Sequence, residues 1–182
     1  KKRGFDCYGV ELSKYTSQKA LEKFPKRIFN GKLEQSKYPN AFFDVITMTD
    51  VIEHITDPNA FFKEIKRILK KNGLILITTP NTDSITKKFM TQNWFQYKEE
   101  HVIYWNAKSI NYLMNQIGFK ILKFKNNNKK LTLRYYNDYF DKYPSILGKI
   151  FRGIFKSLPN FLKKKSFLNP LTGEILVLAK NY

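Results

Sequence analysis

Three ionisable side chains follow an apolar segment closely: Asp50, Glu53 and His54 lie in the stretch TDVIEH, directly after FFDVITM. Carboxylates and an imidazole exchange protons or bind polar groups near neutral pH, so this cluster suits acid–base catalysis or cofactor binding. A structural explanation is also available, because acidic groups near a helix N-terminus interact favourably with its dipole. A lone histidine is also more often structural than catalytic, so the surrounding sequence has to decide.

The chain has one other histidine, His101, and it lies in an aromatic stretch. The aromatic residues near it are Trp94, Phe95, Tyr97, Tyr104 and Trp105. An unperturbed histidine has a pKa of about 6.5, which suits a base that takes a proton from a hydroxyl at neutral pH. We predict that His101 is such a base and that the aromatic residues form a pocket for the molecule that carries the hydroxyl. The alternative is that they are ordinary packing under a loop.

A further acid, Glu11, ends the first stretch that favours a strand, FDCYGVEL. A carboxylate at the end of a strand can accept hydrogen bonds from both hydroxyls of a ribose. The segment GKLEQ follows the next short strand, KRIFNG, and its backbone could meet the edge of an adenine. Each feature alone is weak, because acids at strand ends are common.

Strands that alternate with helices must position these residues. The nearly continuous apolar run 42–48 predicts a strand buried on both faces. Asp57 and Pro58 predict the start of a helix that Gly73 ends in a left-handed cap, and Asn106 and Gly118 bound another helix. The last two strands, 119–125 and 174–180, are expected to be antiparallel to each other. The fold class is therefore α/β: a Rossmann-like, doubly wound, mostly parallel sheet with an antiparallel last strand.

The order of these motifs resembles a known family. The stretches YGVELS, NGKLE, DVIEHITDP, LKKNGLILITTPN and EEHVIYWNAKSINYLMNQIGF are similar to those of class I S-adenosylmethionine-dependent methyltransferases. The branch that they resemble includes the ubiquinone-biosynthesis O-methyltransferases. The resemblance covers residues 8–124 and the last strand. It implies S-adenosylmethionine as the cofactor.

The resemblance also implies roles for individual positions. Glu11 matches the ribose-binding acid, and the family usually has Asp where Lys32 stands, so the backbone N–H of Leu33 is the remaining donor to the adenine. The cofactor-binding candidates are Glu11, Leu12, Lys32, Leu33, Met48, Thr49 and Asp50. His54 and His101 match the two histidines near the acceptor and are the catalytic candidates, and no metal ligand is assigned.

One departure from the family is large. The first strand of the family and its glycine-rich loop, which passes under the carboxypropyl arm of the cofactor, are expected upstream of Lys1. The chain is therefore expected to be either a part of a longer protein or the inactive product of a truncated gene. The remaining motifs favour the first explanation.

Positive charge is concentrated in the second half of the chain. Residues 120–165 hold 13 basic and two acidic side chains, and so carry +11 of the formal net charge of +18. An AT-rich genome would also enrich lysine without any selection for an anionic partner. We predict two parts: a methyltransferase core, 1–125 and 168–182, and a basic amphipathic helical insert, 126–167.

The insert contains PSILGKIFRGIFKSLPNF, which places Leu147, Ile150, Phe151, Ile154, Phe155 and Leu158 on one helical face. Such a helix followed by KKK favours peripheral contact with an anionic membrane through 146–165. The alternatives are that the helix covers the sheet or forms a homodimer interface.

Length and composition limit the remaining possibilities. The 182 residues suffice for one domain with a core, no apolar run is long enough to span a bilayer, and the single Cys7 suggests a reducing, cytoplasmic compartment. We expect methyl transfer to a small-molecule or lipid- or sugar-type acceptor, at a hydroxyl. The main alternative is a non-catalytic methyltransferase-like module that binds RNA or anionic membrane through its insert. A dinucleotide-dependent dehydrogenase ranks lower because the chain has no second catalytic half and DVIEH has no role in that chemistry. A nucleic-acid methyltransferase ranks lower because the chain lacks the Asn-Pro-Pro-Tyr/Phe motif of amino-methylating enzymes.

Overall fold

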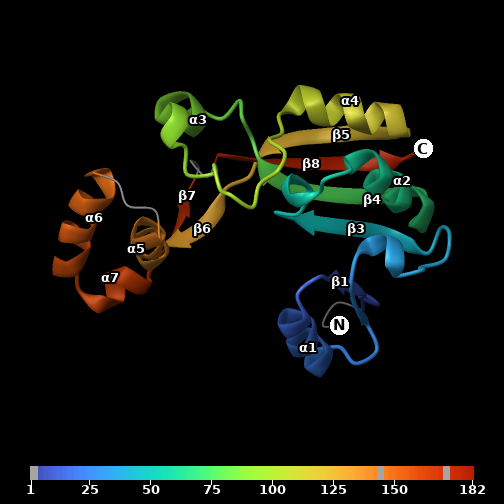
Figure 1. Ribbon diagram of the computed structural model, residues 1–182, viewed down its shortest axis with the longest axis horizontal. Coiled ribbons are helices and arrows are strands. Elements are labelled where there is room, and N and C mark those ends of the chain that lie inside the picture. The colour runs from blue at the N-terminus through green and yellow to red at the C-terminus, as the bar shows by residue number, and fades with distance from the viewer. Residues whose placement is uncertain (1–3, 143–145, 170–172) are drawn as a thin grey trace.

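The computed structural model describes residues 4–142, 146–169 and 173–182, and in them the strands form three separate sheets (Figure 1). The first half contains β1 (Gly9–Glu11), α1 (Lys14–Lys23), β2 (Ile28–Asn30), η1 (Leu33–Gln35), β3 (Phe43–Thr49), η2 (Ile52–His54), α2 (Pro58–Ile68) and β4 (Leu69–Pro80). The second half contains α3 (Ile85–Met90), η3 (Thr91–Asn93), α4 (Ala107–Ile117), β5 (Phe119–Asn126), β6 (Lys129–Thr132), α5 (Leu133–Lys142), α6 (Ile146–Ser157), α7 (Asn160–Lys164), β7 (Ser166–Asn169) and β8 (Glu174–Asn181).

The central sheet has four strands in the order β3-β4-β8-β5. β3 and β4 are parallel, whereas β8 is antiparallel to both β4 and β5. β3, β4 and β5 therefore share a direction, and β8 alone runs against them. This arrangement confirms the predicted mostly parallel sheet and the antiparallel pairing of the last two strands.

β1 and β2 form a parallel pair of their own and do not join β3. The classic doubly wound sheet has the strand order 3-2-1-4-5. In this order β1 and β2 correspond to strands 2 and 3 of the classic fold, and β3 and β4 correspond to its strands 4 and 5. The place of the first strand then falls between β1 and β3, and no described residue fills it. Tyr8 links the two sheets at this point, because its ring contacts Phe42 and Phe43 edge-on, with centroids 5.3 and 5.8 Å away.

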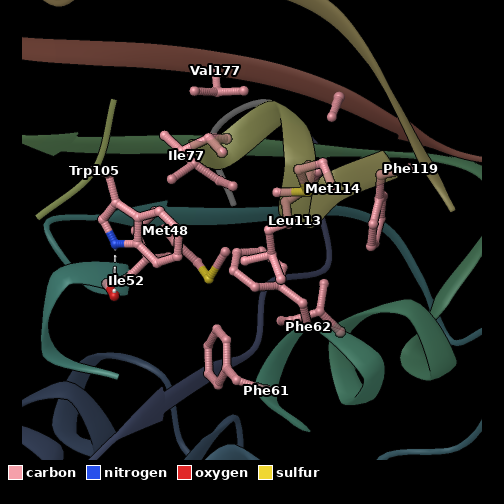
Figure 2. Close-up of a cluster of buried hydrophobic side chains, with 14 of the residues drawn as sticks. Met48, Ile52, Phe61, Phe62, Ile77, Trp105, Leu113, Met114, Phe119 and Val177 are labelled. Atoms are coloured by element: carbon pink, nitrogen blue, oxygen red, sulfur yellow. Dashed lines mark hydrogen bonds between the residues drawn. The ribbon is translucent and has the colours of Figure 1, made fainter. Parts of the chain in front are cut away.

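The core lies on one face of the central sheet. Side chains from β3, β4 and β8 meet there beneath α2 and α4, and Met48, Ile77, Val177, Phe62 and Leu113 are among its members (Figure 2). On the opposite face Val45 and Thr47 of β3 are exposed, and their neighbours in β4, Leu74 and Leu76, are only half-buried. The prediction that strand 42–48 is buried on both faces is therefore wrong: its alternate residues differ in burial, as in a strand covered on one side.

The second helix ends earlier than the sequence predicted. Asp57 caps α2 as expected, since its side chain accepts from the N–H of Ala60. The helix ends at Ile68, however, because Leu69 is buried and pairs with Phe43 as the first residue of β4. Gly73 lies inside β4, and Asn72 has the positive φ of 66° instead. The predicted cap at Gly73 is wrong, and residues 70–72 are an exposed irregularity in the strand.

The following helix agrees with its prediction. The side chain of Asn106 accepts from the N–H of Ser109 at the start of α4, and Gly118 ends the helix in the left-handed region with a φ of 90°. In Figure 1, β6, β7 and α5–α7 lie to one side, away from the helices that cover the central sheet. Within the described ranges, none of the helices has the length and apolar character needed to cross a bilayer.

Candidate functional site

The predicted acids and histidines gather where β3 and β4 end. β3 stops at Thr49, and the N–H of Asp50 donates to the carbonyl of Thr78 in β4 over 3.0 Å. Asp50 has a positive φ of 53°, which is uncommon for a side chain with a Cβ, so the chain turns sharply there. The turn leads into η2, which carries Glu53 and His54.

Glu53 is the most deeply buried charged residue of this region, with 1% of its surface exposed. Its Oε2 accepts from the hydroxyl of Thr79 over 2.8 Å, while its Oε1 has no hydrogen-bond partner among the described residues. Burial raises the pKa of Glu53 above its ordinary value, and the hydrogen bonds from the backbone and Thr79 oppose this only in part. Glu53 is therefore a carboxyl group that resists ionisation.

The backbone of Glu53 brings the second histidine to the first. Its carbonyl accepts from the N–H groups of Val102 and Ile103, at 2.9 and 3.1 Å. This contact places His101 against His54, with ring centroids 4.9 Å apart and an interplanar angle of 78°. His54 is exposed and its Nδ1 lies 2.8 Å from the carbonyl of Glu100. The structure thus brings the two catalytic candidates together.

His101 differs from His54 in its surroundings. It is 8% exposed, and its Nδ1 has no hydrogen-bond partner within the described part of the chain. Burial lowers the pKa of His101, and the positive charge of Lys98 and the nearby His54 lower it further. The surroundings of His101 therefore favour its neutral form, and its Nδ1 is enclosed by the protein without a hydrogen-bond partner among the described residues.

Glu53, His54 and His101 are also close enough together to bind a metal ion. Glu53, His54 and His101 each offer one ligand atom, and these atoms lie within 4.8 Å of one another. Carboxylate and imidazole are common ligands of divalent transition metals. The sequence analysis assigned no metal, and this geometry is compatible with either an ion or a proton-transfer site.

A second polar cluster was missed from the sequence. Glu174, buried at the start of β8, accepts from Lys129 Nζ at 2.7 Å, from Asn127 Nδ2 at 2.8 Å and from Gln96 Nε2 at 3.3 Å. Lys129 Nζ also lies 2.6 Å from Asp50 Oδ2. Burial favours the neutral amine of Lys129, but the two carboxylates outweigh this and raise its pKa. The signal in the sequence was an acid opening an apolar strand, GEILVLA.

The first four cofactor-binding candidates lie at or just after the carboxyl ends of β1 and β2. Glu11 is half-buried at the carboxyl end of β1, where its Oε1 accepts from the N–H of Ser13 over 2.8 Å. Leu12 follows it and is exposed, as is Lys32. Leu33 begins η1 and packs against the core cluster that contains Met48. A partly exposed carboxylate at this strand end fits the ribose-binding role that the family resemblance implies.

The aromatic residues near His101 divide into two groups. Trp94 and Trp105 are buried, and the indole N–H of Trp94 donates to the hydroxyl of Thr86. The indole N–H of Trp105 donates to the carbonyl of Ile52 (Figure 2). These contacts favour the alternative of ordinary packing for the two tryptophans. Tyr97 and Tyr104 lie nearer His101, with the ring of Tyr104 6.0 Å from the imidazole and 5.0 Å from Tyr97.

Comparison with known proteins agrees with this fold. Residues 1–123 match the methyltransferase domain family. The chain is 29% identical over 115 residues to a protein of Mycolicibacterium smegmatis named as an S-adenosylmethionine-dependent methyltransferase (62% of this chain, 43% of the relative). It is 32% identical over 72 residues to the ubiquinone biosynthesis O-methyltransferase of Pelagibacter ubique (40% of this chain, 29% of the relative).

A solved structure shows the same fold. A Bacillus halodurans protein described as a methyltransferase superposes with a TM-score of 0.62 at 18% identity, over 94% of this chain and 80% of its own. The chain spans less than half the length of the two sequence relatives. The chain belongs to the class I S-adenosylmethionine-dependent methyltransferase family, as its motifs predicted.

Proposed function

We propose that this protein transfers a methyl group from S-adenosylmethionine to a hydroxyl of a small-molecule or lipid- or sugar-type acceptor. The observation that carries the proposal is His101: a buried histidine with a lowered pKa and an unpartnered Nδ1, beside His54 at the end of β3. A hydroxyl acceptor must lose its proton at or before methyl transfer, and a neutral imidazole can take it. We propose a hydroxyl as the methylated group because His101 is suited to take its proton.

The sulfonium of the cofactor supplies an activated methyl group, so the main task of the protein is to align donor and acceptor. Glu11 accepts hydrogen bonds from the ribose hydroxyls, and the exposed Leu12 covers the adjacent apolar surface. The backbone of Leu33 donates to the adenine, next to Lys32. Met48, Thr49 and Asp50 line the methionine part.

His101 acts as the base in this proposal. Because burial and Lys98 keep it neutral, it is ready to accept a proton at neutral pH. His54 positions it through the edge-to-face contact of the two rings. Tyr97 and Tyr104 flank the side of the loop where an acceptor would lie. Proton transfer by a positioned side chain contributes roughly 10²- to 10⁴-fold to a rate.

Titration calorimetry of the chain with S-adenosylhomocysteine tests the cofactor assignment. Glu11→Ala should weaken binding by at least roughly tenfold to a hundredfold, since even one hydrogen bond to a charged group is worth about 1.5–3 kcal/mol. Glu22→Ala is the matched control, because Glu22 is an exposed acid in α1 of the same charge. A folded chain that binds no S-adenosylhomocysteine, but binds polyanions in a salt-dependent manner, would support the non-catalytic module instead.

The acceptor class requires a separate experiment. Release of S-adenosylhomocysteine is measured over a panel of phenols, sugars, hydroxylated lipids and amines at equal concentration. Turnover with the hydroxyl compounds, and not with the amines, is expected. Turnover with amines alone would contradict the hydroxyl assignment and leave the cofactor assignment intact.

A further inference from the structure

The apolar face of the amphipathic helix α6 is covered along one edge and exposed along the other. Phe151 packs inward, with its ring centroid 5.4 Å from Phe140 of α5 and 6.1 Å from Phe155. Ile150 and Ile154 lie on the adjoining edge of the same apolar face and are 59% and 60% exposed. The predicted apolar face is therefore covered by α5 only in part, and the side chain of Leu147 lies outside the described residues.

The outward side of α6 is open. At 100° per residue, Ile150, Gly153, Ile154 and Ser157 share one face of a helix, and all four are exposed. A Cβ built on Gly153 would meet no atom within 4 Å. The next helix, α7, adds Phe161, which is 70% exposed. Large apolar side chains grouped in this way usually mark an interaction surface.

Basic residues accompany these apolar side chains. Residues 146–165 contain six basic residues and no acid: Lys149, Arg152, Lys156, Lys163, Lys164 and Lys165. Lys149 and Lys156 are exposed, while Arg152 pairs with Asp141 of α5 over 2.7 Å. The surface formed by α6 and α7 thus combines exposed aliphatic and aromatic groups with an unbalanced positive charge.

The position of these helices excludes one explanation for the apolar residues. α5–α7 lie apart from the central sheet, beyond β6 and β7, so the outward side of α6 does not cover that sheet (Figure 1). A second copy of the chain would bring the same positive charges face to face, which opposes association. RNA would satisfy the lysines but would leave Ile150 and Ile154 in water.

We propose that α6 and α7 dock on the surface of an anionic bilayer. Ile150, Ile154 and Phe161 enter the boundary between headgroups and acyl chains, while the lysines contact lipid phosphates, as amphipathic helices do at interfaces. This inference concerns a surface outside the candidate active site. It does not depend on the proposed methyl transfer.

Sedimentation of the 182-residue chain with vesicles tests the proposal. Binding to vesicles of mixed phosphatidylglycerol and phosphatidylcholine should be at least roughly tenfold stronger than to phosphatidylcholine alone, and should weaken with salt. The double variant Ile150→Ser/Ile154→Ser should lose roughly tenfold or more of this binding, because it removes most of the inserted apolar surface. Both positions are exposed, so its melting temperature should equal that of the wild type.

Leu122→Ser is the matched control, since Leu122 is an exposed aliphatic residue of β5 outside the insert. It should bind vesicles as the wild type does. Equal vesicle binding by the double variant and the wild type would overturn the proposal. So would a wild-type dimer in solution that the double variant converts to monomer, or binding to RNA that exceeds vesicle binding and survives the two serine substitutions.

Discussion

The imidazole rings of His54 and His101 meet edge to face, 4.9 Å apart, and only one of them has its Nδ1 engaged. His54 Nδ1 lies against the carbonyl of Glu100, whereas His101 Nδ1 is buried without a partner among the described residues. The two histidines are therefore not equivalent. In the proposed mechanism His101 is the base and His54 positions it.

Replacing either histidine should separate these roles. His101→Ala should lower the turnover number by roughly 10²- to 10⁴-fold, because the acceptor proton loses its base. His54→Ala should cost less, since only the orientation of His101 is disturbed. Turnover is measured with and without a chelator, because the same side chains could hold an ion, and melting temperatures confirm folding. Unchanged turnover of His101→Ala from pH 6 to 9 would contradict the assignment.

The pH dependence of turnover should show the lowered pKa of His101. Because burial and Lys98 lower this pKa, the acid limb of the rate profile should lie below the ordinary value of about 6.5. Lys98→Met removes a positive charge and should move the limb upward, whereas Glu100→Gln removes a negative charge and should move it downward. Lys88→Met, on α3, is the control and should not move it. Shifts of the same sign in both variants would be inconsistent with this mechanism.

Glu53 should make stability depend on pH in a defined direction. Its pKa is raised in the folded state, so its contribution is fully favourable below its unfolded pKa, about 4.3, and is lost as pH rises through the folded value. Glu53→Gln keeps an acceptor for Thr79 and carries no charge. The melting temperature of the variant relative to the wild type should therefore increase from pH 4.5 to pH 8. A difference in melting temperature that is constant, or that falls with pH, would argue against a raised pKa of Glu53.

Lys129 should matter more for stability than an ordinary surface lysine. Lys129→Met leaves Glu174, whose side chain is 5% exposed, without its cation. We expect a loss of about 2 kcal/mol in the free energy of unfolding, below the ~3–5 kcal/mol of a fully buried pair because part of Lys129 is exposed. Urea unfolding measures this loss, and adding Glu174→Gln should restore much of it.

Lys70→Met provides the comparison for that experiment. Lys70 pairs with Asp44 over a similar distance, 2.7 Å, but both side chains are exposed. Exposed pairs contribute about 0–1 kcal/mol, so the variant should be nearly as stable as the wild type. If the two lysine variants lose equal stability, burial of Glu174 is not the cause.

Local signals in the sequence predicted most of the fold. Asn106, Gly118 and Asp57 act through hydrogen bonds within a few residues, so their roles can be read from the chain alone. The predicted helix cap at Gly73 was wrong because Leu69 pairs with Phe43, so the strand β4 starts before Gly73. This pairing joins residues far apart in the chain and cannot be read from the local sequence. The order of strands and helices along the chain also predicted the antiparallel pairing of the last two strands.

The candidate site was predicted in part. The resemblance singled out His54 and His101, but neither their contact nor their difference in burial was predicted, since both depend on how the loop of residues 100–104 lies against Glu53. The cluster of Lys129 and Glu174 was missed because it joins the insert to the last strand, far apart in the chain. The exposure of Ile150 and Ile154 was missed because it depends on which edge of the apolar face α5 covers, and that contact is tertiary.

Lys129 lies on the first strand of the insert and contacts Asp50 in the turn that follows β3. A ligand that competes for Asp50 would also change how firmly this strand is attached to the core. By thermodynamic linkage, whatever binds the insert would then change the affinity for that ligand by the same factor. The ion pair between Lys129 and Asp50 thus couples ligand binding at Asp50 to binding at the insert.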